Sequence, residues 1–278
     1  MKVISEVLEI SRSNLYEQIH PEPRKKRYDI QDDEYLLPLI RKIVETRQTY
    51  GYRRVTAVLN HFLQEKGKKN VNHKRIYRIM HQHGLLLTRA GRDRTGVKHD
   101  GTVETSTRNT RWCADGFEVT CENGEHVRVI FGLDTCDREI MAFEASTGGY
   151  TAEMAQSVML SCVEYRFGND HTPHAVEWLT DNGACFKAKE TREFGMLLGL
   201  QCRFTPVRSP QSNGMAESFV KTFKRDYIFN HRRDNAAIVL RHLPEWIEDY
   251  NENAPHKGLR MLSPREFIRS FNNRDCPL

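Results

Sequence analysis

The spacing of apolar residues on either side of Asn123-Gly124 most constrains what this chain can fold into. Apolar side chains occupy every second position from Phe117 to Cys121, and again from Val127 to Leu133. A period of two indicates β-strands with one buried face, and Asn-Gly between two such runs is a strong hairpin signal. The sequence therefore predicts an antiparallel hairpin near the start of a folded domain.

The segments after this hairpin predict a layered α/β domain. We expect a third strand at 140–145, a helix at 151–166, a strand at 175–180, a helix at 187–198 and a short strand at 201–205. Three antiparallel strands followed by alternating helix and strand indicate an α/β sheet covered by helices. This is the element order of the ribonuclease-H-like fold, although the order alone also fits other α/β arrangements.

The N-terminal part of the chain is predicted to be helical. Residues 5–19 indicate two short helices with a break near Ser11, and a helix is expected over 33–48 with Pro38 in its first turns. Two more amphipathic helices follow, and Ile76, Ile79 and Met80 form the buried face of the last one. Three short helices with a basic last one match a helix-turn-helix DNA-binding module. An ordinary helical bundle with a solvated basic face is the alternative.

The charges are distributed unevenly along the chain. Residues 1–110 carry 22 Lys and Arg against 13 Asp and Glu, whereas the remainder carries 20 against 24. This asymmetry favours a polyanion-binding module attached to a domain that uses carboxylates. Between the two parts, residues 88–110 are polar and punctuated by glycine, which predicts a linker.

Several classes of protein are excluded by composition. No run of 18 apolar residues occurs, and the N-terminus lacks the pattern of a secretory signal. The seven cysteines are scattered and form no CxxC pair, which argues against a disulfide framework and against a thiolate zinc site. We therefore expect a cytoplasmic protein with structural thiols.

Two carboxylates lie in positions that favour chemistry. Asp115 shares the strand parity of Phe117, so its charge falls on the apolar face unless Gly116 breaks the alternation. A lone buried carboxylate there costs several kcal/mol unless it is paired or bound to metal. Asp181 ends an apolar strand, at a tip where α/β sheets present functional groups.

A third carboxylate, Glu217, falls inside a predicted helix over 212–227. Lys221 and Lys224 share its face of the helix, and Phe219 and Phe223 occupy the packing side. Taken alone, Glu217 with two lysines fits an exposed ion-pair ladder. The sequence blocks around it favour a catalytic role instead.

Three blocks carry a resemblance to a known family. They are Trp112-Cys113-Ala114-Asp115, Leu179-Thr180-Asp181-Asn182-Gly183 and the segment from Ser209 to Phe219 (SPQSNGMAESF). They resemble the OrfB-type transposases of bacterial insertion sequences, which share a catalytic core with retroviral integrases. Thirty-five residues separate Asp181 from Glu217, which is the spacing of that family's DDE signature.

The resemblance extends over nearly the whole chain. The segments 50–55 and 75–80 look like the family's helix-turn-helix, and residues from Tyr250 to Phe267 resemble its C-terminal block. It implies a ribonuclease-H-like catalytic core with a mixed five-stranded sheet flanked by helices, preceded by an all-α helix-turn-helix domain. The implied division is a partial helix-turn-helix and basic connector (1–27), a helix-turn-helix domain (28–88), a linker (89–110), an integrase-like core (111–232) and a helical extension (233–278).

The resemblance also implies the chemistry. Asp115, Asp181 and Glu217 would be the catalytic residues and would hold two Mg²⁺ or Mn²⁺ ions, which oxygen ligands suit. The reaction would be nicking at an element end to expose a 3′-hydroxyl, followed by strand transfer. The residues expected to contact DNA are Lys221, Lys224, Asn182, Ser209, Asn213, Lys74, Arg75 and Arg78.

Some alternatives stay open at this point. Many relatives have Thr before the first Asp and a Thr-Tyr-like pair after it, whereas this chain has Ala114 and Gly116-Phe117. Asp134 and Asp137 are rival candidates for the first metal ligand. Rival functions are a nuclease of the same fold and a DNA-binding regulator without activity of its own.

The resemblance implies partners as well. These are the element ends and target DNA, further copies of this chain on that DNA, and an upstream reading-frame product or a fusion to it. The place of action would be the bacterial cytoplasm, in association with the nucleoid.

Overall fold

The computed structural model describes residues 2–7, 10–20, 30–88, 105–205 and 214–272, in two compact units, 1–42 and 43–278. In the first unit, α1 (Lys2–Val7) and α2 (Arg12–Ile19) flank Ser11. The Ser11 hydroxyl caps α2 by accepting a hydrogen bond from the backbone N–H of Asn14 at 3.2 Å. The predicted break near Ser11 is therefore confirmed.

Helix α3 (Ile30–Thr46) begins earlier than predicted. Pro38 consequently lies in the helix interior rather than in its first turns, so the prediction for its position was wrong. Proline removes one backbone hydrogen bond to the residue four positions earlier, Glu34. Both residues are exposed, so water can satisfy the carbonyl group that this leaves free.

The second unit opens with two of the predicted helices, α4 (Tyr52–Glu65) and α5 (His73–Gln82). Ile76, Ile79 and Met80 are fully buried, as their helical spacing predicted. The Asn60 amide bonds both backbone groups of Val71, at 3.0 and 2.7 Å, and so holds the loop that precedes α5.

A five-stranded mixed sheet forms the centre of the second unit. Its strands are β1 (Arg111–Thr120), β2 (His126–Asp134), β3 (Ile140–Ser146), β4 (Val176–Thr180) and β5 (Leu200–Phe204). Their order is β3-β2-β1-β4-β5; β1, β2 and β3 pair antiparallel, and β4 lies parallel to both β1 and β5. Asn123-Gly124 makes the predicted hairpin turn, with Gly124 at φ +87°. The predicted ribonuclease-H-like class is confirmed.

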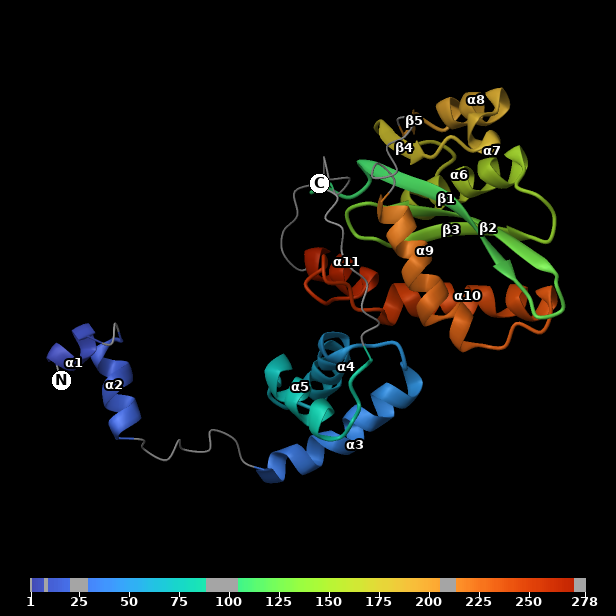
Figure 1. The fold of residues 1–278 in the computed structure, drawn as a ribbon. Helices are drawn as coiled ribbons and strands as arrows, with labels where there is room; N and C mark the ends of the chain where they lie inside the picture. The colour runs from blue at the N-terminus through green and yellow to red at the C-terminus, as the bar shows by residue number, and fades with distance from the viewer. Residues whose placement is uncertain (1, 8–9, 21–29, 89–104, 206–213, 273–278) are drawn as a thin grey trace. The chain divides into compact units, whose positions relative to one another are not determined.

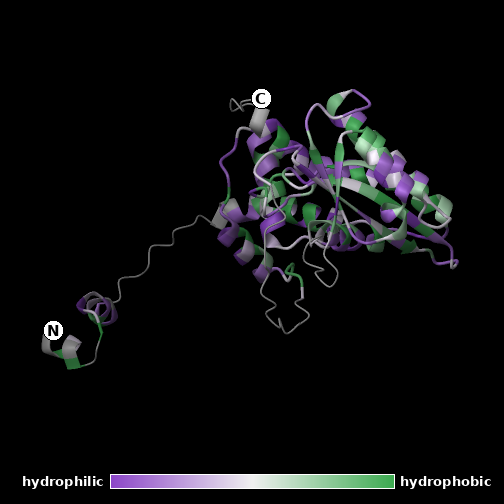
Figure 2. Ribbon diagram, turned by 90° about the horizontal axis from the view of Figure 1, so that it is seen from above, coloured by the Kyte–Doolittle hydropathy of each residue, from purple (hydrophilic) through white to green (hydrophobic). Residues whose placement is uncertain are grey.

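Helices cover both faces of this sheet (Figure 1). One face packs against α9 (Gly214–Asp226) and α10 (Ala236–Asn253), and the other against α6 (Ala152–Phe167). Figure 2 shows hydrophobic residues gathered along the strands and hydrophilic ones on the outer turns and loops. Along β1, Cys113, Phe117 and Val119 face α9, whereas Trp112 and Ala114 face α6.

The segment between β4 and β5 differs from its prediction. Instead of one helix at 187–198, the structure has α7 (Ala184–Lys187) and α8 (Lys189–Leu197). Ala188 separates them because its backbone is extended, with φ −50° and ψ 139°. The turn after Asp181 is therefore shorter than the sequence pattern indicated.

The C-terminal part returns to the sheet. The predicted packing stripe of Trp246, Ile247 and Tyr250 on α10 is buried, and η2 (Ile228–Asn230) and α11 (Pro264–Asn272) flank that helix in the chain. The Asn251 amide bonds the N–H and C=O of Ile140, each at 2.9 Å, and so fixes α10 to the start of β3. No helix in the described ranges is both long and apolar enough to span a membrane.

Candidate active site

Asp115 lies on the sheet face that α9 covers. It pairs with Phe131 and Gly116 pairs with Ile130 in regular register, so Gly116 does not break the alternation. The Asp115 side chain is half-buried, and its Oδ1 accepts a hydrogen bond from the Gly116 N–H at 2.8 Å. Burial raises the pKa of Asp115 to about 6; the Gly116 bond opposes this, and the nearby charges of Asp181 and Glu217 add to it.

Asp181 directly follows β4, the strand that pairs with the beginning of β1. Strands β1 and β4 are parallel, and Cys113 lies opposite Leu179. Asp115 follows Cys113 by two residues, and Asp181 follows Leu179 by two residues. Neighbouring strands lie roughly 4.8 Å apart. Asp181 Oδ1 accepts a hydrogen bond from the Gly183 N–H at 2.9 Å. A Cβ atom at Gly183 would stand 3.0 Å from that oxygen, so the turn favours glycine.

Glu217 comes from the first turn of α9. Its neighbours Ala216 and Phe219 are buried against the sheet, whereas the Glu217 side chain is exposed. Burial raises the pKa of the Cys113 thiol, and a hydrogen bond with the Ala216 backbone opposes that rise. The start of α9 therefore sits beside β1, close enough for Glu217 to act on the pKa of Asp115.

These three carboxylates are not neutralised within the described part of the chain, where no Lys, Arg or His forms an ion pair with any of them. Within the same ranges, no three acidic, His or Cys side chains are already spaced to hold a metal ion. The chemistry of the donor set nevertheless fits a hard divalent cation, because all the donors are carboxylate oxygens. A cation would also relieve the repulsion from Asp181 and Glu217, which adds to the effect of burial on the pKa of Asp115.

The DNA-contacting residues predicted near this site differ in their exposure and in their contacts. Lys221 is exposed, while Lys224 is half-buried with its Nζ 5.8 Å from the centre of the Phe117 ring. Burial lowers the pKa of Lys224, and the charge of Glu118 opposes that shift. Asn182 donates a hydrogen bond to the Thr205 carbonyl at 2.9 Å and so ties the turn after β4 to the end of β5. Ser209 and Asn213 lie outside the described residues.

The predicted contacts on α5 form part of its surface. Lys74 is exposed, and Arg75 and Arg78 are half-buried. Between them Tyr77 is also exposed, and its ring meets Tyr52 edge to face with centroids 5.1 Å apart. The helix therefore presents an aromatic residue beside its basic ones, which the charge pattern had not indicated.

Asp134 and Asp137, the rival ligands, are buried in a structural network. Asp137 accepts hydrogen bonds from Arg166 at 3.1 and 3.0 Å and from Arg108 at 2.8 Å. Asp134 accepts from the N–H groups of Asn109 and Cys136, each at 2.8 Å. Burial raises the pKa of Asp134 to about 6, the charge of Asp137 adds to that rise, and Arg166 opposes it. Their oxygens are already occupied by the protein.

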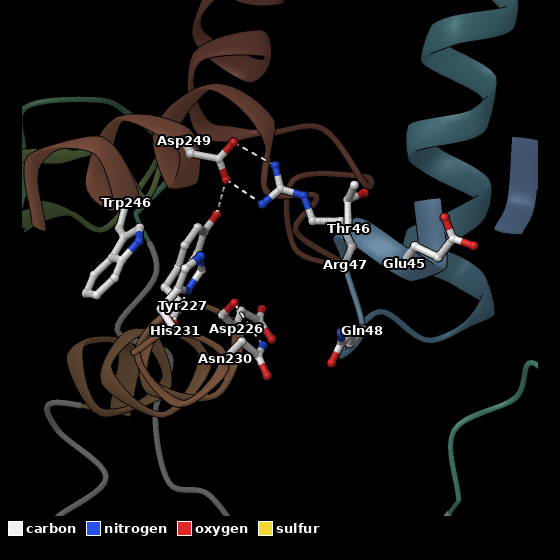
Figure 3. Close-up of a pocket in the computed structure, with 10 residues that line it drawn as sticks. All are labelled: Glu45, Thr46, Arg47, Gln48, Asp226, Tyr227, Asn230, His231, Trp246 and Asp249. Carbon is white, nitrogen blue, oxygen red and sulfur yellow. Dashed lines mark hydrogen bonds and ion pairs between the residues drawn. The ribbon is translucent and has the colours of Figure 1, made fainter. Parts of the chain in front are cut away.

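A polar cavity of about 410 Å³ contains none of the three candidate ligands. Figure 3 shows Arg47 and the Tyr227 hydroxyl directed toward the Asp249 carboxylate. Arg47 makes two bonds of 2.6 Å to Asp249, which also accepts a bond from the Tyr227 hydroxyl at 2.7 Å. Because these charges are paired, we interpret the cavity as a seam between packed segments of residues 43–278.

One residue near the site was not predicted from the sequence. The Tyr150 ring rests on Gly116, where a Cβ atom would stand 2.9 Å from Cε1 of that ring. Tyr150 lies in the connection between β3 and α6, and no spacing rule links that connection to Asp115. The unusual glycine after Asp115 could have hinted at a bulky neighbour.

Comparison with known proteins agrees with this architecture. Residues 31–93 match the family model of an HTH-like domain, and residues 106–210 and 198–264 match two models of an integrase core domain. Among solved structures, the chain resembles the simian T-cell lymphotropic virus intasome in complex with PP2A regulatory subunit B56 gamma. The TM-score is 0.51 at 16% identity, over 79% of this chain and 73% of that one, which supports the fold alone.

Sequence relatives are more specific. The chain is 45% identical over 275 residues to the transposase InsD for insertion element IS2A/D/F/H/I/K of Escherichia coli, covering 97% of this chain and 91% of that protein. It is also 45% identical to transposase InsD for insertion element IS2-9 of Escherichia coli (strain K12), over 97% of this chain and 89% of that one. The chain therefore belongs to the insertion-element transposases, with an integrase core behind an HTH-like domain.

Proposed function

We propose that this transposase nicks DNA at the ends of its insertion element and joins the exposed 3′-hydroxyls to target DNA. The observation that carries the proposal is that Asp115 lies on β1 while Asp181 directly follows the adjacent strand β4, and that the charges of both Asp181 and Glu217 act on Asp115. Within the described residues these carboxylates have no cationic partner. They are the residues we expect to hold two Mg²⁺ or Mn²⁺ ions.

The chain's own part in this chemistry is to fix the ligands. Asp115 and Asp181 each engage Oδ1 with a backbone N–H, of Gly116 and Gly183 respectively, which orients the carboxylate and leaves Oδ2 available. Glu217 approaches from a helix whose buried side holds it against the sheet. When bound, the ions would activate water or a 3′-hydroxyl and stabilise the leaving oxygen at phosphorus.

We further propose how the rest of the chain serves this reaction. Segment 28–88 would bind element ends, segment 111–232 would carry the chemistry, and 1–27, 89–110 and 233–278 would be the connector, linker and extension. Lys74, Lys221 and Lys224 supply positive charge for phosphates, whereas Arg75, Arg78 and Asn182 are expected to hold DNA in register. The working complex would contain further copies of the chain on the DNA of the bacterial cytoplasm.

An assay of cleavage and joining tests the proposal. The probe is a labelled duplex carrying the terminal sequence of the element that encodes the chain, incubated with Mg²⁺ and target DNA. We expect nicked and joined products from the wild-type protein, and neither from Asp181→Asn or Glu217→Gln. Glu193→Gln on α8, which removes an exposed carboxylate whose ionic partner among the described residues is Lys189, serves as the matched control and keeps both activities.

The alternatives give different products. Hydrolysis without any joined strand favours a nuclease, and binding without cleavage favours a regulator that occupies element ends. Unchanged cleavage by Asp181→Asn or by Glu217→Gln removes these carboxylates from the mechanism. Binding itself should weaken with salt, with log K falling by about 0.9 per phosphate contact.

A further inference from the structure

The ring of Tyr150 is seated on the backbone next to Asp115. A Cβ atom built on Gly116 would stand 2.9 Å from Cε1, 3.1 Å from Cζ and 3.4 Å from the hydroxyl oxygen of Tyr150. The hydroxyl end of the ring therefore lies over Gly116 on the α6 side of β1, across the strand from the Asp115 side chain and beyond the last residue of β1 that pairs with β4, Cys113. Only glycine at position 116 leaves room for this arrangement.

The chain fixes the base of this side chain firmly. Tyr150 immediately precedes Thr151, whose hydroxyl caps α6 by accepting a bond from the Met154 N–H at 3.2 Å. On the other side, Arg128 of β2 donates to the Gly148 carbonyl at 2.9 Å. The loop that carries Tyr150 is thus anchored to both a helix and a strand, so the ring position is set by the fold.

The Tyr150 hydroxyl is available to bind a ligand. Tyr150 is 39% exposed, and within the described residues its hydroxyl makes no hydrogen bond. Burial raises the pKa of Tyr150 to about 12, the charges of Glu118 and Asp115 add to this and that of Arg128 opposes it, so the group stays protonated at neutral pH. The phenol is therefore a hydrogen-bond donor with charges of both signs around it, those of Glu118, Asp115 and Arg128.

A hydrogen-bond donor of this kind can bind the phosphate of a DNA strand at the candidate active site. We propose that Tyr150 is a DNA-contacting residue whose hydroxyl donates a hydrogen bond to a non-bridging phosphate oxygen of the strand held at Asp115 and Asp181. This inference rests on the proposed function, because that function places a phosphodiester beside these two carboxylates. A hydrogen bond to an ionised acceptor is stronger than one between neutral groups.

The simpler alternative is that Tyr150 only fills the space above Gly116. In that case the aromatic ring matters and the hydroxyl does not, so Tyr150→Phe would behave as wild type. If the hydroxyl contacts DNA, Tyr150→Phe should instead be impaired, because Phe keeps the ring on Gly116 but removes the hydrogen-bond donor. The comparison of Tyr150→Phe with wild type therefore separates the two roles.

The test is single-turnover cleavage of the duplex carrying the terminal sequence of the encoding element, with Mg²⁺. Tyr150→Phe should lower the cleavage rate roughly 10- to 100-fold, as expected for loss of a hydrogen bond to a charged group. Tyr165→Phe is the matched control on α6; its hydroxyl bonds Glu139 at 2.8 Å, away from Asp115, and its rate should equal wild type. Cleavage by Tyr150→Phe at the wild-type rate overturns the proposal.

A second measurement identifies the contacted atom. Methylphosphonate linkages, which replace one charged oxygen by methyl, are introduced singly at the scissile phosphate and its two neighbours. At one of them the rates of wild type and Tyr150→Phe should converge, because the acceptor is gone. An equal deficit on every duplex indicates a packing defect and overturns the contact.

Affinity distinguishes failure of this inference from failure of the proposed function. If the wild-type protein binds the duplex but never cuts it, the proposed transfer reaction fails. The contact is then judged on binding alone. Weaker binding by Tyr150→Phe, with Tyr165→Phe unchanged, supports it, and equal affinity of all three proteins overturns it.

Discussion

Arg54 and Asp226 form an ion pair, with Nη1 and Oδ2 2.6 Å apart and the Asp226 side chain only 2% exposed. The pair joins the first turn of α4 to the last residue of α9, the helix whose first turn carries Glu217. The Arg54 guanidinium also lies 3.6 Å from the centre of the buried Tyr50 ring. The Tyr50–Arg54 segment, which resembles the helix-turn-helix of relatives, therefore packs against the end of α9 opposite to Glu217.

Replacing Asp226 by Asn should destabilise the protein strongly. Asp226 also accepts hydrogen bonds from Thr49 at 2.6 Å and from the exposed Arg225 at 2.7 Å, so the change leaves Arg54 and Thr49 without their charged acceptor. Breaking such a buried pair costs about 3–5 kcal/mol. Denaturant unfolding of Asp226→Asn measures this loss.

The control is Asp234→Asn, which breaks the exposed pair of Arg232 and Asp234. An exposed pair contributes at most about 1 kcal/mol, so its unfolding midpoint should barely move. Similar losses for Asp226→Asn and Asp234→Asn would show that the buried pair does not hold α4 to α9.

Asp137→Asn should distinguish a structural carboxylate from the three proposed catalytic ones. Asp137 is fully buried and binds Arg166 and Arg108, so its loss should lower the melting temperature by several degrees. The fraction that stays folded at low temperature should still cut DNA, because this carboxylate has no free oxygen for a metal. Loss of cleavage by a fully folded Asp137→Asn protein would restore Asp137 as a ligand.

Much of this architecture could be predicted from the sequence, because the relevant signals are local. The alternation around Asn123-Gly124 and the apolar run before Asp181 mark strands whatever they pair with. The spacing of Phe219 and Phe223 likewise identifies the buried side of α9. Together with the family blocks, these patterns are sufficient to single out the three carboxylates of the candidate site.

Contacts between distant segments could not be predicted in this way. Tyr150 meets Gly116 only because the β3–α6 connection folds back over β1, and Arg54 meets Asp226 across more than half the chain. Neither pairing leaves a periodic signal in the sequence. The break at Ala188 was missed for a different reason, since alanine is a good helix former and its extended backbone follows from tertiary packing.

Stability should fall in acid because of His256. Burial lowers the pKa of this side chain to about 3, and the charges of Arg138 and Arg54 add to the shift. Between pH 6.5 and 3, His256 binds a proton in the unfolded chain but not in the folded chain. The free energy of unfolding should therefore drop by about 1.4 kcal/mol per pH unit across that window from this group.

Asp134 and Asp115 oppose this slope, because the raised pKa of each, about 6, makes the folded protein bind a proton below that pH. The two effects are separated by measuring denaturant unfolding of wild type and His256→Gln between pH 7.5 and 4.5. The variant should lose less stability on acidification than wild type does. Parallel pH profiles for the two proteins would show that His256 titrates normally in the folded state.

Gly132→Ala should destabilise the centre of the sheet. A Cβ atom there would stand 2.5 Å from Sγ of Cys162 on α6 and 3.2 Å from the Trp178 ring, so the helix must shift. Overpacking of this kind costs about 1–3 kcal/mol. Gly149→Ala is the control, because a Cβ atom at Gly149 meets nothing within 4 Å, and its unfolding curve should match wild type. A loss of about 1 kcal/mol in the control, or none in Gly132→Ala, would contradict this packing.

The central claim, that Asp115, Asp181 and Glu217 hold divalent cations on DNA, is tested most directly by counting bound Mn²⁺ through electron paramagnetic resonance. The full chain, bound to the duplex with the terminal sequence of its element, is titrated with Mn²⁺ and compared with Asp181→Asn, Glu217→Gln and Glu193→Gln. We expect two ions per active site in wild type and Glu193→Gln, and weakened or lost binding in the other two. Equal Mn²⁺ binding by all four proteins would contradict the assignment of these carboxylates.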